Sequence, residues 1–383
     1  MHYFTFADKD TTLYQASSSM NTGLDEILEV RKDVSDTGAS VNASRILIKF
    51  DLSFISSSIV SGLIPTPNTN VNANTGSRYY LNLYDAHPTE LATSQVLYAY
   101  PVSGSWTMGD GHSYDNPVTT EGSSWTYRYG KITGTLWSTS PLTGSQVSAS
   151  GGQWFSGSGY VASQSFNHKT TDVRMEVTDI VKSWLSGSLV NEGFMIKRSG
   201  SIGNVHTGSD EGNTTRYGNF SFFSTDTHTK YPPTLETVWD DSKWTTGSLS
   251  PLTGSALEDT VLYMKGLRPE YKEKSKARFR VVGRERFPTK TYSTTPSNLT
   301  VKYLPSGSSY YSITDAETED VIVPFGSGSK LSCDSTGNYF NLWLDGYQPE
   351  RYYTIRYRVV SGSGTVDELD QYFDEGFTFK AVL

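Results

Sequence analysis

The stretch Arg45-Ile46-Leu47-Ile48-Lys49-Phe50-Asp51-Leu52 indicates most clearly how this chain folds. Every even-numbered position in it is apolar, while Arg45, Lys49 and Asp51 occupy odd-numbered positions. Because successive side chains of a β-strand point to opposite faces, this alternation predicts a half-buried strand. The same alternation recurs at 79–84, 173–177 and 193–197, and the segments between are rich in Ser, Gly, Asn and Thr, as turns require.

Strands dominate the rest of the chain as well. Only 178–185 has apolar residues at helical spacing followed by a glycine stop, and 53–58 is predicted to be no more than a short turn or loop. Aromatic residues make up 13% of the chain and include 25 Tyr, whereas charged residues make up only 19%. That composition is typical of turn-rich β structure, so an all-β fold is predicted.

The 383 residues exceed what one hydrophobic core usually organises, which favours two domains. The segment 246–255 has the Gly, Ser, Thr and Pro composition of a linker. We therefore predict a first domain over 1–240, a linker over 241–257 and a second domain over 258–383. Alternating strands in the second domain, together with its length, predict a small antiparallel sandwich that is immunoglobulin-like.

Several classes of protein are excluded or disfavoured by simple counts. Cys333 is the one cysteine, so no intramolecular disulfide forms and a disulfide-stapled secreted domain is excluded. The N-terminus has no secretion-signal pattern, and no apolar run approaches the roughly 18 residues of a membrane span. A formal net charge of −8 provides no overall positive field that would attract nucleic acid or an anionic membrane. We expect neither partner, and expect folding in a cytoplasm.

No motif in the sequence indicates catalysis. The histidines have no metal-ligand spacing to one another or to the cysteine, and neither a nucleophile elbow nor a phosphate-binding loop occurs in its required context. The loop 109–116 contains Asp110 and Asp115 as candidate calcium ligands, although a glycine-rich surface loop explains it equally. The prediction is a protein that is not an enzyme, with no cofactor, metal or catalytic residue.

Four tryptophans in Gly/Ser-rich connections are candidate glycan contacts, because exposed aromatic rings stack on sugars. They are Trp106, Trp125, Trp137 and Trp154. The alternative interpretation is structural: each ring anchors a long loop onto the sheet by burying its own surface.

The most pronounced charge feature is a basic stretch between residues 265 and 290, followed later by acidic clusters. Separated charge of this kind favours docking between subunits, so we predict a candidate assembly interface; the alternative is a solvated strand face balanced by neighbouring acids. The interface residues are Lys274, Lys276, Arg278, Arg280, Arg284 and Arg286.

Several strings resemble a known domain type. They are Asn21-Thr22-Gly23, Phe50-Asp51-Leu52-Ser53 after Arg45, Val177 to Trp184, Asn191 to Lys197, and Pro232-Pro233-Thr234-Leu235. In this order they resemble the DNRLRE-type carbohydrate-binding-like family over roughly residues 8 to 240, with long insertions around 104 to 165. The resemblance implies a jelly-roll-like β-sandwich for the first domain, and the insertions prevent any sugar-binding residue from being carried over.

A second resemblance spans most of the chain. Its strings are Gly122 to Arg128, Phe223 to Thr229 with Tyr231-Pro232-Pro233, Trp239-Asp240-Asp241, Arg278-Phe279-Arg280 with Arg284 to Pro288, and Gly337 to Phe340. The combination resembles structural proteins of large tailed bacteriophages, particularly those that infect marine cyanobacteria. It implies a virion component in the neck, tail, baseplate or capsid decoration, present in several symmetric copies among other virion proteins. An adhesin that contacts host surface glycans is the alternative function.

Overall fold

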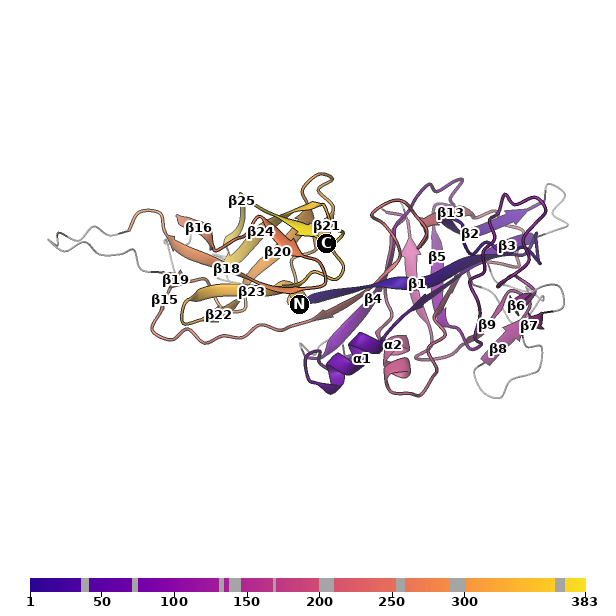
Figure 1. Ribbon diagram of the computed structural model, residues 1–383, viewed down its shortest axis with the longest axis horizontal. Coiled ribbons are helices and arrows are strands. Elements are labelled where there is room, and N and C mark those ends of the chain that lie inside the picture. Colours follow the sequence, from indigo (N-terminus) through magenta and orange to yellow (C-terminus); the bar gives the residue numbers. More distant parts are fainter. Residues whose placement is uncertain are drawn as a thin grey trace. The chain divides into compact units, whose positions relative to one another are not determined.

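The computed structural model describes residues 1–35, 41–70, 75–130, 134–137, 146–167, 170–199, 210–252, 259–288, 292, 301–361 and 369–383, with the backbone alone at 146–149. Over these residues the chain is all-β, as predicted, and strands outweigh two short α-helices (Figure 1). It divides into two compact units. The N-terminal unit comprises Thr5–Asn70 and Arg78–Glu236; the C-terminal unit comprises Met1–Phe4, a short segment that ends at Ser77, and Thr237–Leu383.

Most strands of the N-terminal part belong to one large sheet. Its order is β10-β5-β12-β3-β1-β14-β4-β11, and β2 pairs with both β3 and β13. These strands are β1 (His2–Tyr14), β2 (Ile27–Val34), β3 (Val41–Phe50), β4 (Ser77–Leu83), β5 (Gln95–Pro101), β10 (Ala162–Phe166), β11 (Val173–Glu176), β12 (Phe194–Lys197), β13 (Gly218–Phe223) and β14 (Thr234–Trp239). Two small hairpins accompany it: β6 (Tyr127–Tyr129) with β7 (Thr135–Leu136), and β8 (Gln146–Ala149) with β9 (Gly152–Phe155).

The strand predicted at 45–52 belongs to β3, and it is more deeply buried than predicted. Ala43 to Ile48 are all buried, so both faces are covered and the strand is not half-exposed. Leu47, on the face expected to be polar, packs in a cluster with Trp125 and Trp154. The physical reason is that the connections carrying Trp106, Trp125 and Trp154 lie against this face, which sequence alternation alone does not report.

Both short helices begin without a side-chain cap. α2 (Thr178–Leu185) agrees with the predicted helix and buries Ile180, Val181 and Trp184. α1 (Ser53–Val60) extends a segment that was predicted as a short turn or loop, because Ile55 and Ser58 bury one side of it. Neither described helix is long and apolar enough to cross a membrane.

The C-terminal unit contains two further sheets. One has the order β15-β19-β18-β23-β22 with β16 also on β18, and the other β17-β25-β24-β20-β21. Their strands are β15 (Ser250–Pro251), β16 (Thr260–Lys265), β17 (Glu270–Lys272), β18 (Lys276–Glu285), β19 (Lys302–Tyr303), β20 (Ser309–Asp315), β21 (Val321–Val323), β22 (Ser332–Asp334), β23 (Gly337–Trp343), β24 (Tyr352–Ser361) and β25 (Leu369–Val382), with a 3₁₀ turn η2 (Ser327–Ser329).

Residues of both sheets share one core rich in aromatic rings. Phe340 stacks on Phe279 at a centroid distance of 5.2 Å and on Tyr311 at 4.0 Å. Tyr357 meets Phe340 edge-on at 6.3 Å. Since Phe279 and Phe340 come from one sheet and Tyr311 and Tyr357 from the other, these rings hold the two sheets together.

The predicted linker is wrong over residues 241–252. Thr245 donates its N–H to the carbonyl of Cys333, and β15 pairs in parallel with β19. Leu252 is fully buried in the core of the C-terminal unit. Gly/Ser-rich composition indicates little intrinsic structure, but here the backbone is fixed by hydrogen bonds to residues far along the chain. Residues 253–257 lie outside the described residues.

Candidate functional site

The four tryptophans predicted as glycan contacts are all buried, with 1–3% of their surface exposed. They form one cluster with Leu13, Val102 and Met195, and two of the four indole nitrogens donate hydrogen bonds within the chain. Trp106 donates to the carbonyl of Glu192 and Trp137 to that of Ser124. A ring with so little exposure has no face to offer a sugar, so the exposed-platform prediction is wrong for Trp106, Trp125, Trp137 and Trp154; they anchor loops.

A buried ion-pair network lies against this cluster. Arg45 makes two hydrogen bonds to the carboxylate of Glu211, of 3.0 and 2.7 Å, and Lys197 lies 3.0 Å from the same carboxylate. All three side chains are 0–1% exposed. The Arg45 guanidinium also lies over the rings of Trp125 and Trp154, at 4.7 and 5.1 Å. Aromatic faces and one carboxylate thus stabilise two buried cations.

These partners set the protonation of the network. Burial opposes ionisation of Glu211, but Arg45 and Lys197 outweigh it and hold the pKa of that carboxyl below its ordinary value. Burial lowers the pKa of Lys197 to about 8, and Glu211 only partly opposes this. Neither of the two described pockets is lined by Arg45, Lys197 or Glu211.

The predicted basic residues lie on and beside β18. Lys276, Arg278 and Arg280 point to the outer side of the strand, where they alternate with the buried Ala277 and Phe279. Each of the three cations lies over an aromatic ring of the neighbouring strand β23: Lys276 over Trp343 at 4.7 Å, and Arg278 and Arg280 over Tyr339 at 4.3 and 5.6 Å. We call Lys276, Arg278 and Arg280 the β18 stripe.

The stripe is only partly neutralised. Arg280 forms a two-point pair with Asp334 at 3.0 and 2.7 Å, which holds the pKa of that carboxyl well below its usual range. Arg278 donates to the neutral side-chain oxygen of Asn341. Burial lowers the pKa of Lys276, with Asp241 opposing and Arg278 adding to the effect. Lys276 and Arg278 are therefore the exposed cations that are best placed to meet an acidic partner.

The other three predicted interface residues are less closely grouped with the stripe. Lys274 precedes β18 and lies 3.4 Å from Glu273. Arg284 donates to the carbonyl of Glu285, and Arg286 follows the end of the strand. Three of the six predicted interface residues therefore share one face of β18, and the other three lie near the two ends of that strand.

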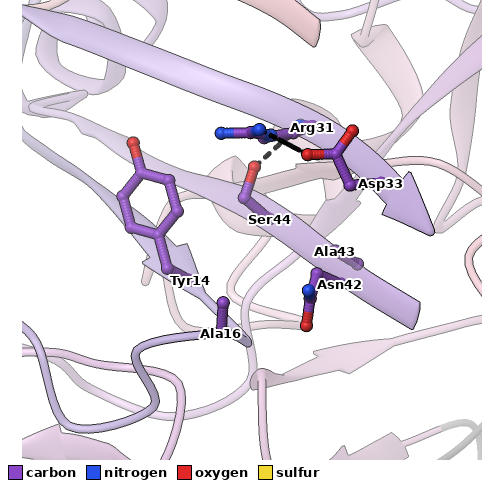
Figure 2. Close-up of a pocket in the computed structure, with 7 residues that line it drawn as sticks. All are labelled: Tyr14, Ala16, Arg31, Asp33, Asn42, Ala43 and Ser44. Carbon is purple, nitrogen blue, oxygen red and sulfur yellow. Dashed lines mark hydrogen bonds and ion pairs between the residues drawn. The ribbon is translucent and has the colours of Figure 1, made fainter. Parts of the chain in front are cut away.

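Sequence reasoning missed a groove with a polar and an apolar half in the N-terminal unit. Two adjoining pockets of about 170 and 220 Å³ share Arg31 and Asp33 on β2. Figure 2 shows Arg31 and Asp33 turned toward each other, with the ring of Tyr14 to one side and Asn42 to the other. We call the two pockets together the Arg31 groove. The signal available in the sequence was the alternation of Glu29, Arg31 and Asp33 along a strand, which reads equally as an ordinary solvated face.

The candidate calcium ligand Asp115 is already used in local hydrogen bonds. Asp115 accepts hydrogen bonds from the His112 N–H and the Thr119 hydroxyl, at 2.9 and 2.6 Å. Within the described residues no group of three or more His, Cys, Asp or Glu side chains is arranged to hold a metal ion. His168 and His206 lie outside the described residues.

Comparison with known proteins provides little more. No family model matches the chain, and no curated protein matches it. Among solved structures, a DUF4785 family protein from Legionella pneumophila is similar at 8% identity with a TM-score of 0.20. The alignment covers 98% of this chain, which spans 65% of the length of that protein. A TM-score this low carries no argument about fold or function.

Proposed function

We propose that the protein is a non-enzymatic structural component of a tailed-bacteriophage particle that acts through contacts between protein subunits. It would sit in the neck, tail, baseplate or capsid decoration, in several symmetric copies. We further propose that the N-terminal unit is a jelly-roll-like sandwich and the C-terminal unit an immunoglobulin-like one. The aromatic core shared by two sheets supports the second assignment, and the sequence resemblances support the first.

The observation that carries the assembly role is the β18 stripe. Cations held over aromatic rings lose less side-chain freedom on docking than free ones, and rings plus arginine are enriched at protein interfaces. Lys276 and Arg278 have no carboxylate partner among the hydrogen bonds and ion pairs of the described residues. The partner surface is therefore expected to be acidic.

The test is charge reversal in particles that assemble with the variant in place of the natural chain. Lys276→Glu with Arg278→Glu leaves the Arg280–Asp334 pair intact, so the chain should still fold, as circular dichroism would check. We expect at least about a tenfold fall in copies per particle, the effect of roughly 1.4 kcal/mol of lost binding. Arg358→Glu, on the other sheet, is the control. Normal incorporation of the double variant would exclude the β18 stripe as the interface.

The adhesin remains the second candidate, and one observation favours it. Its predicted contacts, the four tryptophans, are buried, but the Arg31 groove offers exposed polar side chains and a tyrosine ring on one surface. Glycan binding would then belong to the N-terminal unit and assembly to the C-terminal one.

A further inference from the structure

We infer that the Arg31 groove is a binding site for a neutral saccharide chain, laid across the strands; this rests on the adhesin as a proposed function and gives it residues and a ligand class. None of the four tryptophans and no residue of the β18 stripe lines the groove.

The groove is built on a row of residues that runs across the sheet. Tyr14 on β1 is opposite Ser44 on β3, and the Ser44 hydroxyl accepts from the Arg31 N–H at 2.7 Å. Arg31 on β2 is opposite Asn219 on β13, and Asn219 is bridged to Thr89. Neighbouring strands lie about 4.8 Å apart, so this row spans roughly 19 Å, long enough for more than one sugar ring.

The two halves of the groove have different chemistry. One half is lined by the Tyr14 ring and Ala16, beside Asn42; Ala43 also borders it, but its side chain is buried in the tryptophan cluster. The other is lined by Thr89, Glu90 and Asn219. A pyranose has an apolar face of C–H groups and a rim of hydroxyls, so it meets the tyrosine ring on one side and polar groups at its edge.

Glu29 connects the two halves through hydrogen bonds. Its carboxylate accepts from the Tyr14 hydroxyl at 2.7 Å and also from the Asn219 side-chain amide. One charged acceptor therefore orients the ring of the apolar half and the amide of the polar half together. The Oδ1 atom of Asn219 is buried and accepts no hydrogen bond from the described residues, so the amide is held through its nitrogen alone, by Glu29 and Ser221. Preorganised side chains lose less entropy when a ligand binds.

The wall of the polar half is held in a costly backbone conformation. Glu90 has a φ of 53°, a left-handed value that is unfavourable for a glutamate, and it faces Gly218. A Cβ at Gly218 would lie 2.3 Å from the Glu90 carbonyl oxygen, so only glycine permits this close approach. Two hydrogen bonds between Thr89 and Asn219, of 3.0 and 2.9 Å, hold the wall in place.

The charges of the groove select a neutral ligand. Asp33, Glu90 and the Glu29 carboxylate beside them give it three negative charges against the one positive charge of Arg31, so anionic sugars meet net repulsion. Arg31 lies at the junction of the two pockets, paired with Asp33 at 2.5 Å, and opposes a bare cation there. Donors and acceptors remain for hydroxyl groups, because the exposed fractions of Arg31 and Asp33 are 52% and 36%.

Both pockets are smaller than the roughly 300–1,000 Å³ that hold drug-sized ligands. A single site of this size binds weakly, with a Kd on the order of 1 mM, and symmetric copies in a particle would raise the avidity. Affinity should rise with chain length up to the number of rings that the row accommodates.

The experiment uses the full chain and a panel of glycans displayed on a multivalent carrier. Neutral oligosaccharides of one to four hexose or N-acetylhexosamine units are compared with sialylated, sulfated and uronate-containing chains. We expect binding to at least one neutral chain, increasing with length, and at least about a tenfold loss in Arg31→Ala and Asp33→Asn. Lys182→Ala, an exposed cation on α2 of the same unit, should bind as the natural chain does.

Binding that survives in Lys276→Glu/Arg278→Glu shows that the groove acts independently of assembly, so the two proposals fail separately. The inference is overturned if no neutral chain binds at about 10 mM, if only anionic chains bind, or if the two groove variants bind as well as the natural chain. Preferential capture of an extended peptide by the groove would also overturn it.

Discussion

The two units place their charges in opposite ways. In the N-terminal unit Arg45, Glu211 and Lys197 are 0–1% exposed, beneath a cluster of tryptophans. In the C-terminal unit Arg358 pairs with Asp370 on the surface of β24 and β25, each about a third exposed, while the interior is aromatic. Removing one partner of a buried ion pair costs several kcal/mol of stability, because the other charge is left uncompensated. A surface pair contributes little to stability, and its charges remain accessible to a partner.

The largest expected effect comes from breaking the buried network. Glu211→Gln keeps the shape of the side chain but leaves Arg45 and Lys197 without their carboxylate, so the free energy of unfolding should fall by about 3–5 kcal/mol. Urea denaturation followed by tryptophan fluorescence measures this. A loss below about 1 kcal/mol would show that the backbone carbonyls and aromatic rings alone sustain the two cations.

A second buried charge gives a pH-dependent effect. The Asp10 carboxylate is fully buried, accepts from the Thr225 N–H at 2.8 Å, and has its pKa raised by burial to about 7. The folded protein therefore binds this proton more tightly than the unfolded one, and the contribution to stability is lost as pH rises from about 4 to about 7.

Asp10→Asn removes that loss. The difference in unfolding free energy between Asp10→Asn and the natural chain should shift in favour of the variant as pH rises from 4 to 8, by up to about 4 kcal/mol. Thermal or urea unfolding at several pH values measures the difference. Asp334→Asn has the opposite sign, because Arg280 lowers the pKa of Asp334 and the stability it supplies is lost as pH falls. A pH-independent difference for Asp10→Asn contradicts the account.

The smallest effect is expected on the surface of the C-terminal unit. Asp370→Asn removes the acceptor of Arg358 in an exposed pair, which costs less than about 1 kcal/mol because water screens the charges. The same denaturation measurement applies, and high salt should shrink the effect further. A loss as large as that of Glu211→Gln would erase the contrast between the units.

Some features of the fold were readable in the sequence. Alternation at 45–52 and composition predicted an all-β chain, and the helix at 178–185 was found from apolar spacing. The basic side chains of β18 were also visible, since strand alternation alone places Lys276, Arg278 and Arg280 on one side.

Other features needed contacts between distant parts of the chain. Gly/Ser-rich composition predicted a linker over 241–257, yet Leu252 is buried in a core. The same composition around Trp125 and Trp154 did not tell whether these rings are exposed or buried. They are buried because they pack in a cluster with Leu47. The Arg31 groove combines four strands and a loop, and no local pattern joins Tyr14 to Thr89.

The sequence by itself determined the fold class, because side-chain periodicity is a local property of each strand. It also determined which charges exist and which side of a strand carries them. The tertiary structure decided which of those charges are buried, since that depends on what lies above each face. Arg45 and Arg278 both lie on alternating strands, and only packing makes the first a fixed part of the core and the second an exposed cation.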